Sequence, residues 1–232
     1  MLQLSQRNRV VPKSTAKLSR ADAISAAAAE PLRRASTSTI RLCNLRDPRP
    51  DVDPLRLSAA QKLVLYRSLG YPSRPSDSDL ISAHIDFVFN RDASLRRDRY
   101  SNSVNALYTS MDRTTAESEM RYHSRVNFFN PSYPKMSFSF AVVKVNFNGR
   151  LRDIRQICTK TPGLLSKRKK DLCQLVGASA MPGADAILVR SVRFNGDNQV
   201  TYVRGTVSPG RVLGTAVIDV FVRATGRHTR IR

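Results

Sequence analysis

Residues 106–119, ALYTSMDRTTAESE, decide how this chain is expected to fold. Their first half is a short segment of β-forming residues, and Thr114 followed by Glu117 has the spacing of a capping box at a helix start. A strand is therefore expected to end, and a helix to begin, within a few residues. This change of direction is expected to bring the ring of Tyr108 and the carboxylate of Glu119 to the same side of the fold.

The segments on either side continue an alternation of helices and strands. Helical spacing of apolar residues, or a high content of Ala, predicts helices over 24–34, 57–72, 114–126 and 166–181. Dense or alternating β-branched and aromatic residues predict strands over 83–90, 105–111, 138–147, 184–194, 198–205 and 211–224. This pattern predicts an α+β fold, and no internal repeat of about 20 to 50 residues occurs.

The beginning of the chain differs in composition from the rest, which predicts an extension over 1–55 and a folded domain over 56–232. The first 50 residues contain ten Lys and Arg but three acids, with many Ser, Thr and Ala. PRPDVDP (48–54) predicts an extended linker. Two interpretations stay open for the extension: a flexible basic tail, or a segment for export or delivery.

Composition and charge limit the classes of protein to consider. The 232 residues include 39 Lys and Arg against 18 Asp and Glu, a formal charge of +21, and such an excess attracts polyanions. No apolar run of about 18 residues is present, so no transmembrane helix is expected. Three scattered histidines and three cysteines without ligand spacing predict no metal site and reduced thiols in a cytosol-like compartment.

Nucleic-acid binding is the function that the charge alone suggests. The basic residues are dispersed, however, and no helix-turn-helix, zinc-finger or RRM pattern occurs. SKRKK (166–170) and the basic extension would bind phosphates without sequence preference. A non-enzymatic, nucleic-acid-binding protein therefore stays open as an alternative to an enzyme.

Candidate residues for phosphate binding and glycosidic cleavage lie in the folded part. The Gly-rich phosphate loops are absent, so arginines such as Arg67 and Arg99 must bind any phosphate, through bidentate contacts. A carboxylate such as Glu119 can stabilise an oxocarbenium-like transition state. Ser191 lies in an apolar segment without the motif of a nucleophilic serine, which favours a hydrogen bond to a ligand.

Four motifs in order resemble the RES family, which is named for its Arg, Glu and Ser. They are LYRSL (65–69), ALYTSMDRTTAESE, AVVKVNFNGRLRDI (141–154) and GADAILVRSVRFNGDNQVTYV (183–203). They look like the family's early LYR, its ALY and TA-x-x-E pattern, its strand-turn-strand, and its Gly-x-Asp-x-Leu-x-Val-x-Ser strand with a hairpin. The resemblance covers about residues 60–205. It implies a split mixed β-core with surrounding helices, similar to ADP-ribosyltransferase toxins, around an NAD cleft.

The resemblance also implies a role for each matched residue. By position, Arg99 looks like the family arginine before the ALY strand, and Arg67 looks like the early arginine. Tyr108, Glu119 and Ser191 look like the family's Tyr, Glu and Ser. The implied catalytic residues are Glu119, Arg99 and Ser191, and the implied NAD-binding residues are Arg67, Arg99, Tyr108 and Ser191.

One motif departs from the family pattern. The family has Gly-Gly-Arg-Trp-Asn around its arginine, where this chain has RDRYS (97–101). Both glycines are replaced, so the approach of the backbone to the ligand is expected to differ. Arg97 is a rival for Arg99 as the family arginine.

The function that the resemblance implies is that of a toxin acting on NAD in the cytoplasm of its target cell. The enzyme would cleave the nicotinamide–ribose bond as a glycohydrolase or phosphorylase, with NAD as substrate and no metal. An antitoxin or immunity protein is the expected partner. The basic extension suggests a secreted or injected effector. The acceptor of the ADP-ribosyl group stays open between water, phosphate and a host protein.

Arginine-specific ADP-ribosyltransferases are the second enzymatic interpretation. They use Arg, then Ser-Thr-Ser, then Glu-x-Glu, and Glu117-Ser118-Glu119 imitates the last element. STST (36–39) precedes the candidate arginines, however, so the order is wrong and the RES interpretation is favoured. A third interpretation is an NAD fold that now serves only as an interaction module, since the glycines are lost.

Overall fold

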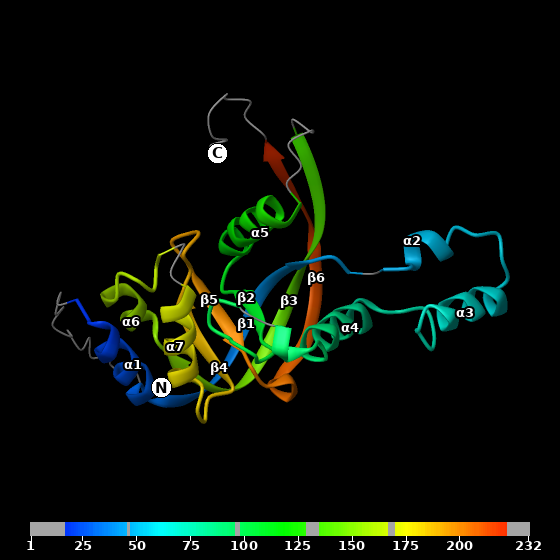
Figure 1. Ribbon diagram of the computed structural model, residues 1–232. Coiled ribbons are helices and arrows are strands. Elements are labelled where there is room, and N and C mark those ends of the chain that lie inside the picture. The colour runs from blue at the N-terminus through cyan, green and yellow to red at the C-terminus, as the bar shows by residue number, and fades with distance from the viewer. Residues whose placement is uncertain (1–16, 46, 96–97, 129–134, 167–169, 222–232) are drawn as a thin grey trace, which may run out of the picture.

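A computed structural model of the chain describes residues 17–45, 47–95, 98–128, 135–166 and 170–221. These residues form a body of sheet and helices, from which a helical arm extends to one side (Figure 1). Within the described residues, no helix is both long enough and apolar enough to cross a membrane.

The sheet of the described residues has six strands and is mixed. The strands are β1 (Leu32–Cys43), β2 (Leu107–Ser110), β3 (Lys135–Asp153), β4 (Ala186–Arg190), β5 (Asp197–Thr201) and β6 (Val207–Phe221). Their order is β1-β2-β5-β4-β3-β6; β3 and β4 are parallel, and the other pairs are antiparallel. The predicted α+β fold with a mixed β-core is confirmed.

An additional pairing between β1 and β3 closes five of the strands into a ring. β1 pairs with β3 along its whole length, from Leu32 opposite Arg152 to Cys43 opposite Ala141. It also meets β2, through Ile40 opposite Ser110. The ring β1-β2-β5-β4-β3 thereby brings the first strand beside the strand that ALYTS predicts, although more than 60 residues separate them.

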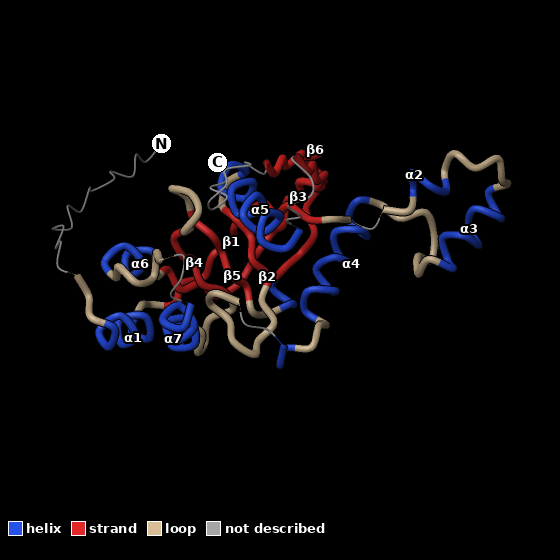
Figure 2. Tube along the Cα trace, turned by 45° about the horizontal axis from the view of Figure 1, so that its top comes forward, coloured by secondary structure: helices blue, strands red, loops and turns tan. Residues whose placement is uncertain are grey.

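Helices cover the outside of this ring in two groups, α1, α6 and α7 in one and α4 and α5 in the other, whereas α2 and α3 lie on the arm (Figure 2). The helices are α1 (Arg20–Ala29), α2 (Arg49–Val52), α3 (Ala59–Ser68), α4 (Asp77–Phe89), α5 (Arg113–Phe128), α6 (Arg155–Lys160) and α7 (Lys170–Ala180), with 3-10 turns at Ala93–Leu95 and Arg204–Thr206. α1 packs against α6 and α7, and α6 against β4. α5 lies against β1, β2 and β6, and α4 against β2 and β6.

The N-terminal part of the chain corrects the prediction of an extension over 1–55. Residues 32–43 form β1, and α1 buries Ala23 and Ala27 in the same apolar cluster as Val176 of α7. The sequence of β1 is largely polar, but all twelve of its residues pair in register with β3. Composition could not show this, because the partner strand lies about 100 residues later. Residues 1–16 lie outside the described residues.

Two further expectations about local structure are wrong. Residues 83–90 were expected as a strand, but they belong to α4, which a capping box of Ser76 and Asp79 begins. Ile81, Ile85 and Val88 are buried at helical spacing, and a short window of this pattern imitates alternation. The expected linker over 48–54 contains the short helix α2. Parts of two other expected elements, residues 167–169 and 222–224, lie outside the described residues.

The start of α5 also differs in its cap. Asp112, rather than Thr114, caps the helix: its carboxylate accepts hydrogen bonds from the backbone N–H and the hydroxyl of Thr115, at 2.8 and 2.7 Å. Glu117, the expected second member of a capping box, instead pairs with Arg113 at 2.7 Å. The predicted helix is confirmed and begins at Arg113.

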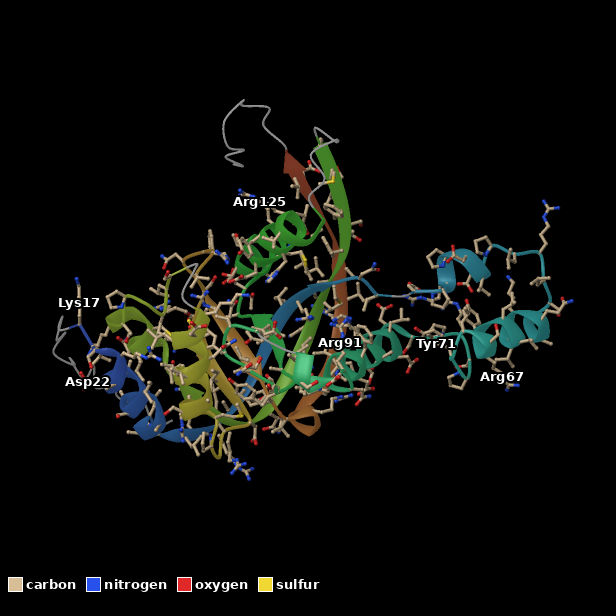
Figure 3. The ribbon with its side chains drawn as sticks, in the orientation of Figure 1. Lys17, Asp22, Arg67, Tyr71, Arg91 and Arg125 are labelled. Carbon is tan, nitrogen blue, oxygen red and sulfur yellow. The ribbon has the colours of Figure 1, made fainter. Side chains whose placement is uncertain are left out.

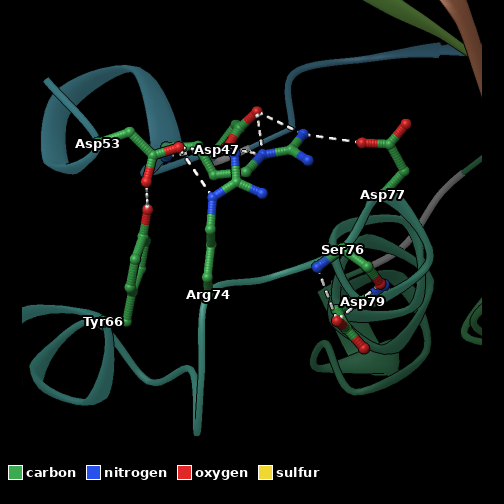
Figure 4. Close-up of polar contacts among 8 residues, drawn as sticks. Asp47, Asp53, Tyr66, Arg74, Ser76, Asp77 and Asp79 are labelled. Carbon is green, nitrogen blue, oxygen red and sulfur yellow. Dashed lines mark hydrogen bonds and ion pairs between the residues drawn. The ribbon is translucent and has the colours of Figure 1, made fainter. Parts of the chain in front are cut away.

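The arm, defined here as residues 47–76, contains α2, α3 and the loops around them. Arg67 and Tyr71 lie on this projecting part, away from the sheet (Figure 3). A network of polar contacts braces the arm and ties it to the start of α4 (Figure 4). The network joins Arg49 to Asp47 and Asp77, and Asp53 to Arg74 and the hydroxyl of Tyr66.

Candidate active site

The structure brings together two of the predicted catalytic residues, Glu119 and Ser191. Glu119 lies in the second turn of α5, and Ser191 directly follows β4. The hydroxyl of Ser191 donates a hydrogen bond to Oε1 of Glu119 at 2.6 Å, across 72 residues of sequence. Both side chains are at least partly buried, so this short bond lies in a shielded environment.

The hydroxyl of Ser191 is held by its own turn as well. It accepts hydrogen bonds from the backbone N–H groups of Arg193 and Phe194, at 3.1 and 3.2 Å. Because the hydroxyl oxygen accepts both of these bonds, its single proton remains available for donation to Glu119. The β4–β5 turn therefore fixes the direction in which Ser191 donates.

Asn198 is a second donor to the same carboxylate, and the sequence did not single it out. Its Nδ2 donates to Oε1 of Glu119 at 2.9 Å, and its Oδ1 accepts from the hydroxyl of Ser110 at 2.7 Å. Ser110 and Asn198 are directly opposite in the β2–β5 pairing. A relay Ser110–Asn198–Glu119 therefore links the end of β2 to the helix that follows it. The position of this polar residue, Asn198, near the start of the expected strand over 198–205 was the available signal.

A close approach between the β4–β5 turn and α5 makes these contacts geometrically available. A Cβ atom at Gly196 would lie 1.9 Å from Oγ1 of Thr115, which leaves no room for a side chain there. The backbone N–H of Met111 also donates to the carbonyl of Asp197 at 2.9 Å. Gly196 thus lets the hairpin press against the start of the helix that carries Glu119.

Tyr108 lies on β2, two residues before Ser110, so both side chains are on one face of the strand. Its hydroxyl accepts a hydrogen bond from the backbone N–H of Tyr100 at 2.7 Å and is 3.4 Å from the hydroxyl of Ser101. Burial raises the pKa of the Tyr108 phenol well above its usual value. Tyr108 therefore stays neutral and anchors the segment that contains Arg99.

Arg99 lies in that anchored segment. Its guanidinium donates to the carbonyl oxygens of Leu164 and Ser166, and its Nε is buried without a hydrogen-bond partner among the described residues. Both acceptors are neutral, and no ion pair of Arg99 occurs among the described residues, so its guanidinium is suited to an anionic ligand. The rival, Arg97, lies outside the described residues.

Arg67 is placed differently from the other predicted residues. It is exposed on α3 of the arm, and its Nε donates to the carbonyl of Pro72 at 3.4 Å (Figure 3). The structure does not bring it to Glu119 or Ser191.

Arg41, on β1, is the arginine that the structure places beside the predicted residues. It donates to the carbonyl of Tyr108, and its Nε donates to Nε2 of His84 at 3.0 Å. Burial, together with the charges of Arg41 and Arg91, lowers the pKa of His84 to about 3, so the imidazole is neutral and can accept this bond. Sequence reasoning missed Arg41 because it assigned residues 1–55 to an extension; the β-branched residues before it were the available signal.

The arrangement combines one carboxylate, held by neutral donors, with two arginines around Tyr108: Arg41 bonds its carbonyl, and Arg99 precedes the residue whose N–H bonds its hydroxyl. Among the described residues, neither arginine contacts Glu119 directly. Such a site can stabilise a developing positive charge next to a bound anion. Among the described residues, no group of three or more His, Cys, Asp and Glu side chains could hold a metal ion.

Comparison with known proteins gives the family of this chain. No curated protein gives a significant match. Among solved structures, a similar chain comes from the M. tuberculosis MbcT–MbcA toxin–antitoxin complex, with a TM-score of 0.48, 11% identity, and coverage of 84% of this chain and 91% of that chain. The RES domain matches residues 64–206, which is more than half of the chain and includes Arg99, Tyr108, Glu119 and Ser191. The chain belongs to the RES domain family.

Proposed function

We propose that this protein is a toxin or delivered effector that cleaves the nicotinamide–ribose bond of NAD and so depletes NAD in the cytoplasm of a target cell. The observation that supports this function most directly is the contact of Glu119 with Ser191 and Asn198. These residues come from three separate elements and converge on one carboxylate oxygen. The choice of NAD as the substrate follows from the membership of the chain in the RES domain family.

The environment of Glu119 suits the charge that develops in this reaction. As the bond from C1′ of the ribose to the nicotinamide nitrogen breaks, its electron pair leaves with nicotinamide and the ribose gains oxocarbenium character. Ser191 and Asn198 orient the Glu119 carboxylate without cancelling its charge. A fixed negative charge at this position stabilises the transition state more than the ground state.

The arginines of the site provide the matching contacts for the rest of the substrate. Arg99 has a buried Nε–H that finds no acceptor in the described part of the chain, and Arg41 lies beside Tyr108. Guanidinium groups bind phosphate oxygens bidentately, so these residues are suited to the pyrophosphate side of NAD. Water or inorganic phosphate then attacks the ribose carbon, giving ADP-ribose or its phosphate.

The test is NAD consumption by the purified protein, with products identified by mass, for wild type, Glu119→Gln and Glu117→Gln. Glu119→Gln keeps the shape of the side chain and removes its charge, so turnover is expected to fall about 100-fold or more while NAD still binds. Glu117→Gln is the matched control. Glu117 is two residues earlier on the same helix and is paired with Arg113.

The two variants also separate the enzymatic interpretations. Equal turnover in wild type and Glu119→Gln would exclude the proposed role of Glu119. A loss in both variants would favour the Glu-x-Glu chemistry of ADP-ribosyltransferases, and host lysate would then be examined for ADP-ribosylated protein. Intact NAD under every condition, with or without phosphate, would exclude NAD cleavage.

We further propose an antitoxin or immunity protein as partner, as the family resemblance implies. An enzyme that degrades NAD harms the cell that makes it unless its site is covered. Expression of wild type without a partner is expected to arrest growth, whereas Glu119→Gln should be tolerated. Equal toxicity of the two would show that harm comes from something other than NAD cleavage, such as binding to polyanions.

A further inference from the structure

Arg193 carries a positive charge beside the Glu119–Ser191 pair, and it is not among the site residues predicted from the sequence. It lies two residues after Ser191, and its backbone N–H donates to the hydroxyl of Ser191 at 3.1 Å. Its guanidinium carbon is 3.3 Å from the centroid of the Tyr122 ring. Tyr122 is three residues after Glu119 on α5, so the two lie on neighbouring positions of one helix face.

The guanidinium of Arg193 is held in place by stacking, but one of its N–H groups has no hydrogen-bond acceptor among the described residues. Stacking on Tyr122 fixes the plane of the group. Its Nη1 is buried and has no hydrogen-bond partner among the described residues. An unpaired N–H of a charged group, removed from water, costs free energy that an acceptor on a ligand would recover. Stacking engages the face of the planar guanidinium and not its N–H edge, and the N–H groups at that edge are the ones that bind an acceptor.

We propose that Arg193 is a binding residue for a phosphate-type anion of the ligand, at the edge of the Glu119 site. This inference rests on the proposed function for the identity of that anion, which is the pyrophosphate of NAD or an inorganic phosphate that attacks the ribose. The chemistry common to both is bidentate binding of phosphoryl oxygens by a preorganised guanidinium. Arg193 would thus hold the anion while Glu119 faces the cationic ribose.

The experiment measures binding without turnover, by calorimetry at low ionic strength. The probes are ADP-ribose, inorganic phosphate and nicotinamide riboside, which lacks phosphate. The proteins are wild type, Arg193→Gln, Arg193→Lys and Arg121→Gln. Arg121 is an exposed arginine next to Tyr122 on the same helix, so its variant makes the same change in charge without touching the stack.

Arg193→Gln is expected to weaken binding of ADP-ribose about 10-fold or more, the scale of lost hydrogen bonds from a charged group. Arg193→Lys should recover part of the affinity, because it restores the charge but not the planar fork. Arg121→Gln should stay within about twofold of wild type. Affinity for nicotinamide riboside should be unchanged throughout. If Arg193→Gln does not fold, the partial loss in Arg193→Lys serves as the test.

The probes separate the outcomes. A loss confined to ADP-ribose assigns Arg193 to the pyrophosphate, and a loss confined to inorganic phosphate assigns it to the attacking group; both support the inference. Wild-type affinity for both anions in the Gln and Lys variants would overturn it and leave Arg193 as a structural clamp on Tyr122. Arg193-dependent phosphate binding by a wild-type protein that does not cleave NAD would keep the anion site and exclude the proposed function.

Discussion

The arm and the candidate active site both collect charged side chains, but they hold them in opposite ways. On the arm, carboxylates face guanidinium groups: Asp53 pairs with Arg74, and Asp47 pairs with Arg49. At the site, Glu119 is held by neutral groups, the hydroxyl of Ser191 and the amide of Asn198. Both regions therefore contain carboxylates, but those on the arm are paired with positive charges and Glu119 is hydrogen-bonded to neutral groups.

The difference teaches which charges are available for chemistry. Hydrogen bonds from Arg74 and Tyr66 lower the pKa of Asp53 to about 2. The charge of this carboxylate is therefore already neutralised by its partners within the arm. Neutral donors fix the position of Glu119 but do not neutralise its negative charge, which stays available to a positively charged part of a ligand. By this criterion the arm is a structural element, and the edge of the ring near β4 and β5 is the place that we propose for catalysis.

The largest effect is expected from placing a second carboxylate at the site, in contrast to the arm, where each carboxylate faces a guanidinium group. Asn198→Asp would put a second carboxylate next to Glu119, and two close carboxylates cannot both ionise easily. In the proposed mechanism Glu119 acts as a carboxylate, so a second negative charge beside it is expected to move the acid limb of the pH–rate profile to higher pH. Turnover at neutral pH should fall about 10- to 100-fold. The measurement is NAD turnover across pH 5 to 9, for both proteins.

Ser110→Ala is the control for this variant. It removes the hydroxyl that orients Asn198 but adds no charge, so a smaller loss with an unshifted pH profile is expected. A pH profile of Asn198→Asp that coincides with that of wild type would show that Asn198 does not act through Glu119.

A direct comparison of two arginines comes next in size. Arg41→Gln removes charged hydrogen bonds to Tyr108 and His84, and kcat/KM for NAD is expected to fall about 10-fold. Arg67→Gln changes an exposed residue of the arm, and its kcat/KM should stay within about twofold of wild type. The reverse ranking would support the LYR resemblance and mean that the arm closes over the site when NAD binds.

The smallest effect is expected on the arm itself. Asp53→Asn should leave NAD turnover unchanged and lower the melting temperature by no more than about 3 °C, because the ion pair with Arg74 is exposed. The pKa of the Asp53 carboxyl is lowered from its ordinary value of 3.8 to about 2 in the folded protein. Its charge therefore stabilises the fold fully at pH values above 3.8, and this contribution disappears as the pH falls through about 2. The variant should therefore lose less stability than wild type between pH 4 and 2, by thermal unfolding. A loss of turnover would contradict the structural role of the arm.

Local patterns were sufficient for much of the site. The helix that carries Glu119, the strand that carries Tyr108 and the strand before Ser191 are all elements whose residues prefer those conformations, so propensity and tertiary structure agree. Residue order then led to the RES family without any knowledge of contacts. The strand expected over 83–90 failed because a short apolar run fits either period, and the buried face of α4 decides between them.

By itself, the sequence determined the α+β class, the family and the pair Glu119 and Ser191 as candidates. Only the tertiary structure decided that these two side chains meet, that Asn198 and Arg193 join them, and that Arg41 lies beside Tyr108 while Arg67 lies on the arm. The physical reason is that β1 owes its place to backbone pairing with β3, about 100 residues away. Such long-range pairing leaves no local mark in a polar segment, and so the first strand of the ring was expected to be a tail.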